Sequence, residues 1–367
     1  MKFRCERDVL VEALGTAGRA VVAKGAGSPA LAGVHLRLDH DELRLAGVDR
    51  DLTIQTRVTV AGGGDGAAVL PSRLAVDIVR SLEPGAVIVE SGEDDVVRIA
   101  SGRSQFSVRG LPVEEFPRLL PPSGDPVTLE SGALAGALRQ VVRAASTDND
   151  RPVLTGVLLA ATDSGLRLVA TDSYRLAMRD LPGSAVLGAG QKVLLPSRAL
   201  AELQRLLSTG TEDVALRLGE FEAHFDVGPT RLTTRLLEGE YPNYANLIPK
   251  GYPNRLVVGK DALLDAVRRV RLMTRDATTP VRLSLRPDGV ELTVITPDLG
   301  QATEDVDAKY EGVEFTIAFN PAYLADGVEA VDGDEVVLET QDAGKPATIH
   351  ATDGSDYLYL LMPVKVS

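Results

Sequence analysis

Two segments of the chain carry arginines at matching positions of a repeated pattern. LPSRLAVDIVR begins at position 70, and LPSRALAELQR begins at position 195. The corresponding pairs are Arg73 with Arg198 and Arg80 with Arg205. Residues seven apart on a helix superpose within about 20°, so each helix would present one cationic face. Such a face is suited to a polyanion such as duplex DNA, whose charges lie about 1.7 Å apart along the axis.

The same helical segments carry an apolar stripe on the side opposite the arginines. In the first it consists of Leu74, Ile78 and Leu82, and in the second of Ala199, Leu203 and Leu207. An amphipathic pattern of this kind predicts a helix with a buried face and a solvent face. Other helical segments show a related bias, with Arg19 and Lys24, with Arg139 and Arg143, and with Arg268, Arg269, Arg271 and Arg275. The chain has no Trp, which disfavours stacking on single-stranded bases and favours a sequence-independent contact with duplex backbone.

A threefold internal repeat supplies these helices. Pro71, Pro196 and Pro321 occur at equal intervals, and each is expected to open a helix, because proline tolerates the first helical turn. The block EEFPRLLP at 114–121 recurs as GEYPNYANLIP at 239–249. Asp49, Asp172 and Asp298 also occupy equivalent places. A regular self-similarity of this length indicates repeated structural units.

Each repeat reads as helix, strands, helix and strands. The first helices are predicted near 6–22, 131–145 and 261–274, and alternating strands follow them with turn sequences at 163–165 and 287–289. Pro-rich stretches at 119–126 and 247–254 separate the repeats. The sequence therefore predicts three α+β domains of one fold, with boundaries at 1–124, 125–250 and 251–367.

Composition limits the class of protein. The formal net charge is −13, and Cys5 is the single cysteine. An acidic total is compatible with one basic face, and a lone cysteine indicates a reducing compartment. The first residues lack the apolar core of a signal peptide, and no apolar run approaches the roughly 20 residues of a membrane helix. We expect a soluble, cytoplasmic protein with no membrane contact.

No set of residues predicts catalysis, a metal or a cofactor. His35, His40, His224 and His350 lack the spacing of metal ligands. The segment AGGGDG at 61–66 lacks the Gly-Lys-Ser/Thr of a phosphate loop and is interpreted as a flexible connection between strands. The acidic cluster SGEDD at 91–95 is interpreted as a solvated turn, and Cys5 as structural. No catalytic residue, metal or cofactor is therefore predicted.

The sequence resembles one known family. VATDSYRLA at 169–177, EGEYPNYANLIP, the three-copy plan and the ending YLYLLMPVKVS are similar to the beta subunits of bacterial DNA polymerase III, the sliding clamps of the DNA-clamp family. The resemblance covers the whole chain. It implies three DNA-clamp domains per chain and a ring of two chains with six domains, with helices inside and sheets outside. It also implies a non-catalytic processivity factor in DNA replication, which encircles duplex DNA and tethers the replicative polymerase and other partners.

The resemblance assigns roles to particular residues. DNA contacts are expected from Lys24, Arg73, Arg80, Arg139, Arg143, Arg151, Arg198 and Arg205. A cleft for short linear motifs of polymerase and clamp-loader subunits is expected from Leu154, Thr171, Ser173, Tyr174, Arg175, Leu176, Pro242, Leu247, Leu360, Met362, Pro363, Val364 and Lys365. Closure of the homodimer is expected through Phe106 on one side and Leu272 and Met273 on the other, with Phe106 on an edge strand.

Plainer interpretations of the same residues stay open at this point. Surface arginines often only complement a helix dipole, Arg175 could form a structural salt bridge, and LLMPV could be a core strand. Alternative functions are a specialised second-copy clamp, a peptide-docking scaffold that ignores DNA, and a metal-dependent nuclease. The scaffold predicts that changing Arg73, Arg80, Arg198 and Arg205 together leaves function intact, whereas a clamp would lose DNA contacts.

Overall fold

The computed structural model describes residues 1–21, 28–92, 95–208, 212–276, 279–354 and 356–365. They form two compact units, one of residues 1–132 and 202–236 and the other of residues 133–201 and 237–367. The three repeats of the sequence are therefore distributed over two units, and the second repeat contributes to both. Among the described residues, no helix combines the length and the apolar character needed to cross a membrane.

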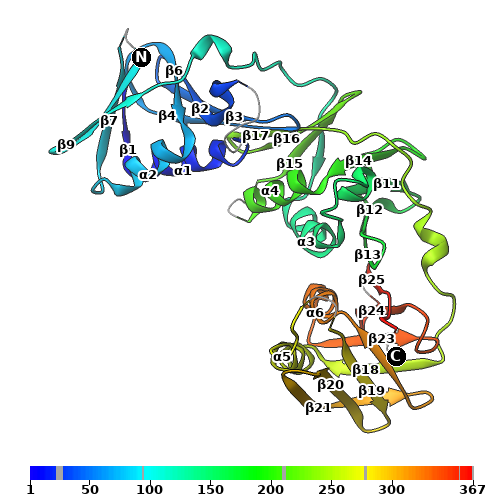
Figure 1. Cartoon of the computed structure of the whole chain (residues 1–367). Coiled ribbons are helices and arrows are strands. Elements are labelled where there is room, and N and C mark those ends of the chain that lie inside the picture. Colours follow the sequence, from blue (N-terminus) through cyan, green and yellow to red (C-terminus); the bar gives the residue numbers. More distant parts are fainter. Residues whose placement is uncertain (22–27, 93–94, 209–211, 277–278, 355, 366–367) are drawn as a thin grey trace. The chain divides into compact units, whose positions relative to one another are not determined.

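The first repeat lies entirely in the first unit (Figure 1). Its elements are β1 (Lys2–Glu6), α1 (Arg7–Gly18), η1 (Pro29–Ala32), β2 (Gly33–Asp39), β3 (Glu42–Val48), β4 (Leu52–Thr59), β5 (Ala61–Gly64), β6 (Gly66–Pro71), α2 (Ser72–Ser81), β7 (Ala86–Ser91), β8 (Val96–Ser101), β9 (Ser104–Arg109) and η2 (Val113–Glu115).

The second repeat follows the same order. Its elements are β10 (Val127–Leu129), α3 (Ser131–Val141), η3 (Val142–Ala144), η4 (Pro152–Thr155), β11 (Gly156–Thr162), β12 (Gly165–Thr171), β13 (Arg175–Pro182), β14 (Lys192–Pro196), α4 (Ser197–Leu207), β15 (Val214–Leu218), β16 (Glu222–Val227), β17 (Thr230–Arg235) and η5 (Tyr244–Leu247).

The third repeat completes the second unit. Its elements are β18 (Asn254–Gly259), α5 (Lys260–Arg271), β19 (Val281–Arg286), β20 (Gly289–Thr296), β21 (Gly300–Glu311), β22 (Phe315–Phe319), α6 (Pro321–Ala330), β23 (Glu335–Thr340), β24 (Ala347–Ala351) and β25 (Tyr357–Leu361). The expected α+β organisation in three similar copies is confirmed. Each copy also begins with a short strand before its first helix, which the helical pattern did not reveal.

Antiparallel sheets join neighbouring repeats. The first unit contains a five-stranded sheet in the order β5-β1-β7-β8-β9 and an eight-stranded sheet in the order β10-β15-β16-β17-β4-β3-β2-β6. The second unit contains a twelve-stranded sheet in the order β14-β11-β12-β13-β25-β24-β23-β18-β21-β20-β19-β22. Strand β17 of the second repeat pairs with β4 of the first, and β25 of the third repeat pairs with β13 of the second. Backbone hydrogen bonds therefore close both junctions between repeats.

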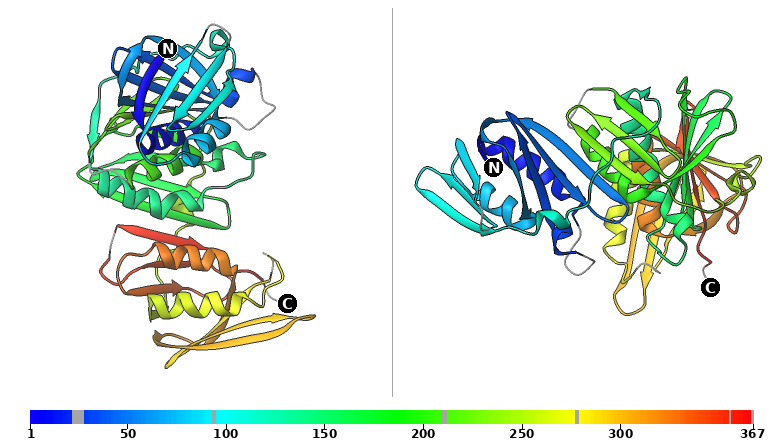
Figure 2. Two further views of the ribbon diagram at one scale, coloured as in Figure 1. Left: turned by 90° about the vertical axis from the view of Figure 1, so that its left-hand side faces the viewer. Right: turned by 90° about the horizontal axis from the view of Figure 1, so that it is seen from above.

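Helices cover one face of the sheets in each unit. In the first unit α1 packs on β2, β3 and β4 and against α2, and the two helices lie side by side (Figure 1). In the second unit Figure 2 shows α5 and α6 side by side on their sheet. The core of the first unit lies between its helices and both sheets, with Phe3, Leu10 and Leu36 among its fully buried members. Burial of such apolar side chains is the main favourable contribution to folding.

The ends of several elements differ from the sequence predictions. The helix expected over 6–22 ends at Gly18, and the one expected over 131–145 ends at Val141 and continues as the 3-10 turn η3. Pro321 is the first residue of α6, as expected, but Pro71 and Pro196 are the last residues of strands that lead into α2 and α4. The Gly-rich segment at 61–66 is not merely a connection, because β5 forms an edge strand beside β1.

Candidate functional site

Helix α2 carries the first pair of predicted DNA-contacting arginines. Arg73 and Arg80 are both exposed, and the side chain of Arg73 is 97% exposed, with Asp77 3.8 Å away. Ala75, Ile78, Val79 and Leu82 form the buried side of this segment. The predicted stripe was wrong at Leu74, which is 49% exposed, because the buried face runs through Ala75 and Val79 instead. The helix still presents a cationic side to solvent and an apolar side to the core.

Helix α4 repeats this arrangement. Arg198 and Arg205 are exposed, whereas Ala199, Leu203 and Leu207 are buried as predicted. Arg205 also donates a hydrogen bond from Nη1 to Oε1 of Glu202 at 2.8 Å, within its own helix. Pairs of this kind on a helix surface contribute only about 0.3–0.5 kcal/mol, so the arginine is readily available to another anion.

The arginines of α3 and η3 have partners from the third repeat. Arg139 forms an ion pair with Asp332 at 2.6 Å, and Arg143 forms one with Glu329. The hydrogen bond from Arg143 holds the pKa of Glu329 below its usual value. Both predicted DNA-contacting arginines are therefore already bound to carboxylates of the same unit. Arg151 has its Nε 3.5 Å from Asp148 and donates from Nη1 to Ser173 at 3.1 Å.

Lys24, the remaining predicted DNA contact, lies outside the described residues.

The third repeat also has cationic residues on α5 with acidic neighbours. Arg269 makes two hydrogen bonds to Glu304, of 2.8 and 3.0 Å, and these raise the pKa of Arg269 and lower that of Glu304. Arg268 lies 3.3 Å from Asp265. Arginines of α3, η3 and α5 are therefore paired with carboxylates of the third repeat.

A tight turn between β12 and β13 forms one side of the predicted cleft. The carboxylate of Asp172 accepts hydrogen bonds from the backbone N–H groups of Tyr174 and Arg175, at 2.9 and 3.0 Å. Short polar side chains stabilise turns in this way, and Ser173 adopts a φ of 80°. The turn leaves Tyr174 60% exposed at its tip. Thr171 is buried and donates from Oγ1 to the carbonyl of Arg175 at 2.6 Å.

Arg175 points away from solvent, and its side chain is only 10% exposed. Its guanidinium contacts Asp172 at 3.0 Å, pairs with Asp326 of α6 and lies 4.2 Å from the centre of the Tyr323 ring. It also donates to the carbonyl of Arg143. The salt bridge that the sequence left open is therefore present, and Arg175 supports the turn from beneath.

Several apolar residues predicted for the cleft are buried. Leu176 and Leu360 are register partners on β13 and β25, and both belong to a buried cluster. Leu154 is buried nearby at 7% exposure. Tyr241 and Tyr244 pack against this cluster, and a pocket of about 470 Å³ lies beside them, lined also by Leu158, Leu194, Leu237 and Pro242.

Tyr241 contributes a polar atom to this apolar region. Its hydroxyl donates to the carbonyl of Val169 at 3.4 Å, and burial raises its pKa, so it stays protonated. The sequence prediction missed Tyr241, Tyr244, Val169, Leu158 and Leu194. The block GEYPNYANLIP at 239–249 was a signal for the two tyrosines, whereas the strand residues depend on pairing that only the fold defines.

Three residues predicted for the cleft are exposed apolar side chains, and one of them, Pro242, lines the pocket. Pro242, Leu247 and Met362 are all exposed, and Leu247 ends the 3-10 turn η5. The C-terminal segment is anchored by backbone hydrogen bonds from Met362 to Tyr174 at 2.9 Å and from Val364 to Ala318 at 2.7 Å. Pro363 is half-buried and Lys365 is exposed. A pocket beside a buried apolar cluster, with a few polar groups, is a common feature of ligand-binding sites.

The residues expected at a dimer interface are on accessible elements. Phe106 lies on β9, the edge strand of the five-stranded sheet, and is half-buried against the core. Its edge position was predicted and is confirmed. Leu272 follows α5 and is 82% exposed, and Met273 beside it is half-buried. A free strand edge and a strongly exposed leucine are each typical of surfaces that pair with another chain.

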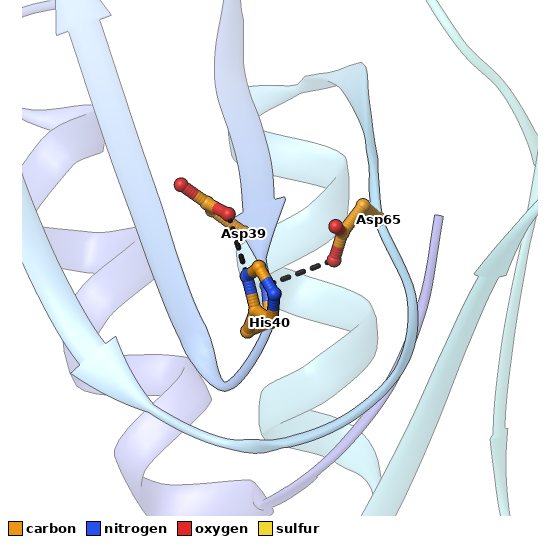
Figure 3. Close-up of side chains that lie close together, drawn as sticks. All are labelled: Asp39, His40 and Asp65. Atoms are coloured by element: carbon orange, nitrogen blue, oxygen red, sulfur yellow. Dashed lines mark hydrogen bonds and ion pairs between the residues drawn. The ribbon is translucent and has the colours of Figure 1, made fainter.

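Asp39, His40 and Asp65 lie close together, although no common role was predicted for them (Figure 3). His40 Nδ1 lies 2.9 Å from Asp39, and the backbone N–H of His40 donates to Asp65 at 2.8 Å. The hydrogen bond to Asp39 raises the pKa of His40. All three side chains are exposed, so solvent competes at every ligand atom, and the group is interpreted as a surface turn.

Of the acidic turn at 91–95, Glu93 and Asp94 lie outside the described residues.

Comparisons with known proteins cover the whole chain. Three family models match in sequence order: DNA polymerase III beta subunit, N-terminal domain, over residues 1–121; central domain, over 128–243; and C-terminal domain, over 245–365. The beta sliding clamp of Streptomyces coelicolor is 34% identical over 381 residues, covering all of both chains.

Solved structures agree with the sequence matches. The DNA polymerase sliding clamp of Bacillus subtilis covers all of both chains, with a TM-score of 0.91 and 29% identity. The sliding clamp of Bartonella birtlesii bound to griselimycin covers all of both chains, with a TM-score of 0.92 and 32% identity.

Proposed function

Because the chain belongs to the DNA polymerase III beta subunit family, we propose that it is a sliding clamp: a ring that encircles duplex DNA and acts as a processivity factor in replication. The observation that carries this proposal is the matched cationic face of α2 and α4. Arg73 and Arg80 on one helix, and Arg198 and Arg205 on the other, are exposed opposite a buried apolar side. Four such arginines at repeated positions provide contacts to phosphates that carry no sequence information.

Binding of the arginines to DNA phosphates is electrostatic and independent of the DNA sequence. Counterions condensed on the duplex are released when arginines approach its phosphates, so binding weakens as salt is added. Arg139 and Arg143 contribute less to DNA affinity because each is paired with a carboxylate. These two residues and Arg151 therefore act as secondary contacts. A loosely held duplex and a topological link together allow movement along DNA without dissociation.

Ring formation requires a second copy of the chain. Two chains with three clamp domains each would give six domains around a central hole, with domain boundaries at 1–124, 125–250 and 251–367. Phe106 of one chain would meet Leu272 and Met273 of the other, and the two head-to-tail contacts close the ring. A non-catalytic role follows, because topology and tethering supply the whole effect. Such a clamp would act on chromosomal DNA in the cytoplasm.

The cleft of the second unit is the docking site for partner proteins. Its rim of Pro242, Leu247 and Met362 and its floor around Leu176 and Leu360 would receive apolar anchors of a short linear motif. DNA polymerase and clamp-loader subunits are the partners this predicts. The sliding clamp of Bartonella birtlesii was crystallised bound to griselimycin, which supports ligand binding within the family.

Two measurements test the proposal. Small-angle X-ray scattering over a concentration series should give twice the 38.9 kDa chain mass and the profile of a hollow ring. After loading by a clamp loader, the protein should stay on nicked circular duplex in high salt and slide off once the circle is cut. A compact monomer at every concentration, or equal retention on linear and circular DNA, would rule out encirclement.

A further inference from the structure

Three arginines lie in one row across neighbouring strands of the first unit. Arg37 on β2 is directly opposite Arg44 on β3, and Arg44 is directly opposite Arg57 on β4. All three are exposed. Because side chains alternate along a strand, they project from the face opposite to Leu36 and Leu43, which face the helices and the core.

This row is unfavourable for the isolated protein. Like charges directly opposite each other in an antiparallel pair are destabilising. Glu42 pairs with Arg44, but within the described part of the chain no carboxylate lies at ion-pair distance from Arg37 or Arg57. The repulsion among the three arginines lowers stability, and carboxylates of the chain offset little of it. This points to an anion outside the chain as the partner of the row.

The second repeat shows that the fold does not require this row. Its equivalent positions, at the same register of the β11–β12 hairpin and β13, hold Ala160, Arg167 and Asp180. Arg167 there makes two hydrogen bonds to Asp180, of 2.6 and 2.7 Å. The row is thus neutralised within the repeat.

The third repeat neutralises the same positions in another way. The equivalent residues are Ser284, Glu291 and Asp305. The neighbouring Arg286 lies 3.7 Å from Glu291 and also pairs with Asp305. Only the first repeat, among the described residues, carries cations at all three positions.

The arginine row forms part of a pocket of about 690 Å³ contained in the first unit. The adjoining row of the sheet contributes His35, Gln55 and Arg231. The segment 113–119 forms a wall, where the ring of Phe116 stacks on His35 with centroids 4.7 Å apart. The arginines lining the pocket are Arg37, Arg44, Arg57, Arg118 and Arg231.

A single carboxylate lines the pocket among the described residues, and it is already bound. Asp226 pairs with Arg231 and with Arg217. Despite partial burial, hydrogen bonds from these two arginines hold the pKa of Asp226 below its ordinary value. Although the chain carries a formal charge of −13, this pocket is strongly cationic.

We propose that this pocket binds an acidic peptide segment of a partner protein. The planar fork of a guanidinium matches a carboxylate with two parallel hydrogen bonds. Neighbouring strands lie about 4.7–4.9 Å apart, so the three arginines form a short ladder for closely spaced acidic side chains. A pocket of this volume holds a short segment, within the usual range for ligand sites.

The position of the pocket distinguishes it from the DNA-contacting surface. Arg37 and Arg57 lie on the face of the eight-stranded sheet that is opposite to α1, and α2 packs against α1. The ring of Phe116 is already stacked on His35, so it offers less surface to a nucleic acid base. The inference does not depend on the clamp function, because it rests on this pocket alone.

Fluorescence anisotropy of the full chain tests the proposal. The probe is a short fluorescein-labelled peptide of alternating glutamate and serine, and unlabelled oligothymidylate and inorganic phosphate serve as competitors. We expect the glutamate peptide to bind and its glutamine counterpart not to bind. Arg44→Gln with Arg57→Gln should weaken binding about tenfold or more, since hydrogen bonds to charged groups are worth that much.

Matched variants separate this pocket from general charge. Arg4→Gln with Arg98→Gln removes two exposed arginines of the five-stranded sheet and should leave binding unchanged. The R44Q/R57Q variant should keep or raise its melting temperature, because it relieves like-charge pairing. Arg44→Glu with Arg57→Glu should instead bind a peptide of alternating lysine and serine. Equal weakening by both double variants, or stronger binding of oligothymidylate at this pocket, would overturn the proposal.

Discussion

The guanidinium of Arg175 and the carboxylate of Asp326 form an ion pair that joins the second repeat to the third. The two residues are 151 positions apart in the sequence. Arg175 simultaneously fixes the turn that carries Tyr174, through its contact with Asp172. A residue that the sequence motif placed in a ligand cleft therefore also holds two repeats together.

Replacing Arg175 with Ala should destabilise the second unit by about 3–5 kcal/mol, because Asp172 and Asp326 would be left without their shared cation in a largely buried place. Urea unfolding followed by circular dichroism measures the loss. Arg167→Ala is the control, since its pair with Asp180 is more exposed and should cost about 1 kcal/mol. Similar losses in both variants would argue against a special role for Arg175.

Truncating the cleft rim should weaken peptide binding without unfolding the protein. Leu247 and Met362 are exposed, and a large apolar side chain contributes about 1.5–3 kcal/mol when a ligand buries it. Leu247→Ala and Met362→Ala should each reduce affinity for a peptide with two apolar anchors by about tenfold, measured by calorimetry. Leu299→Ala, at another exposed leucine of this unit, should have no effect, and a loss there would point away from the cleft.

Removing the cationic face of α2 should weaken DNA binding and make it less sensitive to salt. Each lost phosphate contact lowers the slope of log affinity against log salt by about 0.9. We expect this from Arg73→Gln with Arg80→Gln, and a larger effect when Arg198→Gln and Arg205→Gln are added. Anisotropy of labelled duplex over a salt series measures the slope. An unchanged slope in the fourfold variant would favour a scaffold that does not touch DNA.

Changing Phe106 should open the proposed dimer. Phe106→Ala removes an aromatic group from an edge strand, and aromatic residues at interface centres typically contribute 2 kcal/mol or more. The dimer should dissociate at protein concentrations at least tenfold higher than in the unchanged protein, and Leu272→Ala should act in the same direction. Analytical ultracentrifugation follows the change. Phe221→Ala, at a 63% exposed phenylalanine elsewhere in the first unit, should leave the mass distribution as it was.

Stability should fall as pH decreases below about 6.5, partly through His224. Burial holds the pKa of this histidine below its usual value of 6.5, and its Nδ1 lies 2.9 Å from the hydroxyl of Thr233. Below 6.5 the unfolded chain therefore takes up a proton that the folded chain does not, which favours unfolding. His224→Gln should reduce the difference between urea midpoints at pH values of about 7.5 and about 5.5. If the difference between the two urea midpoints is unchanged in the variant, other titrating groups determine how stability depends on pH in this range.

Features set by local pattern were predictable from the sequence. The period of apolar residues identified the buried side of α4, and turn sequences at 163–165 and 287–289 correctly joined β11 to β12 and β19 to β20. Phe106, between small and polar neighbours, was correctly placed on an edge strand. In each case, residues close in sequence decide the outcome.

Features set by distant pairing were not predictable. The exposed side chain of Leu74 and the arginine row at Arg37, Arg44 and Arg57 depend on which elements pack together and in which register. The partner of Arg175 lies on a helix of another repeat. The apolar floor around Tyr241 likewise draws residues from strands far apart in the chain. Spacing within one repeat contains no information on these contacts.

The pairing of β4 with β17 has a consequence for biosynthesis. Thr56 and Thr230 face each other across this junction with their hydroxyls 3.0 Å apart, although 174 positions separate them. A ribosome adds about 5–20 residues each second. Strand β4 is therefore synthesised roughly ten to forty seconds before β17. During that interval the first repeat exposes an open strand edge, which is a template for pairing with other nascent chains. A shortened chain that stops after the first repeat would keep that edge permanently.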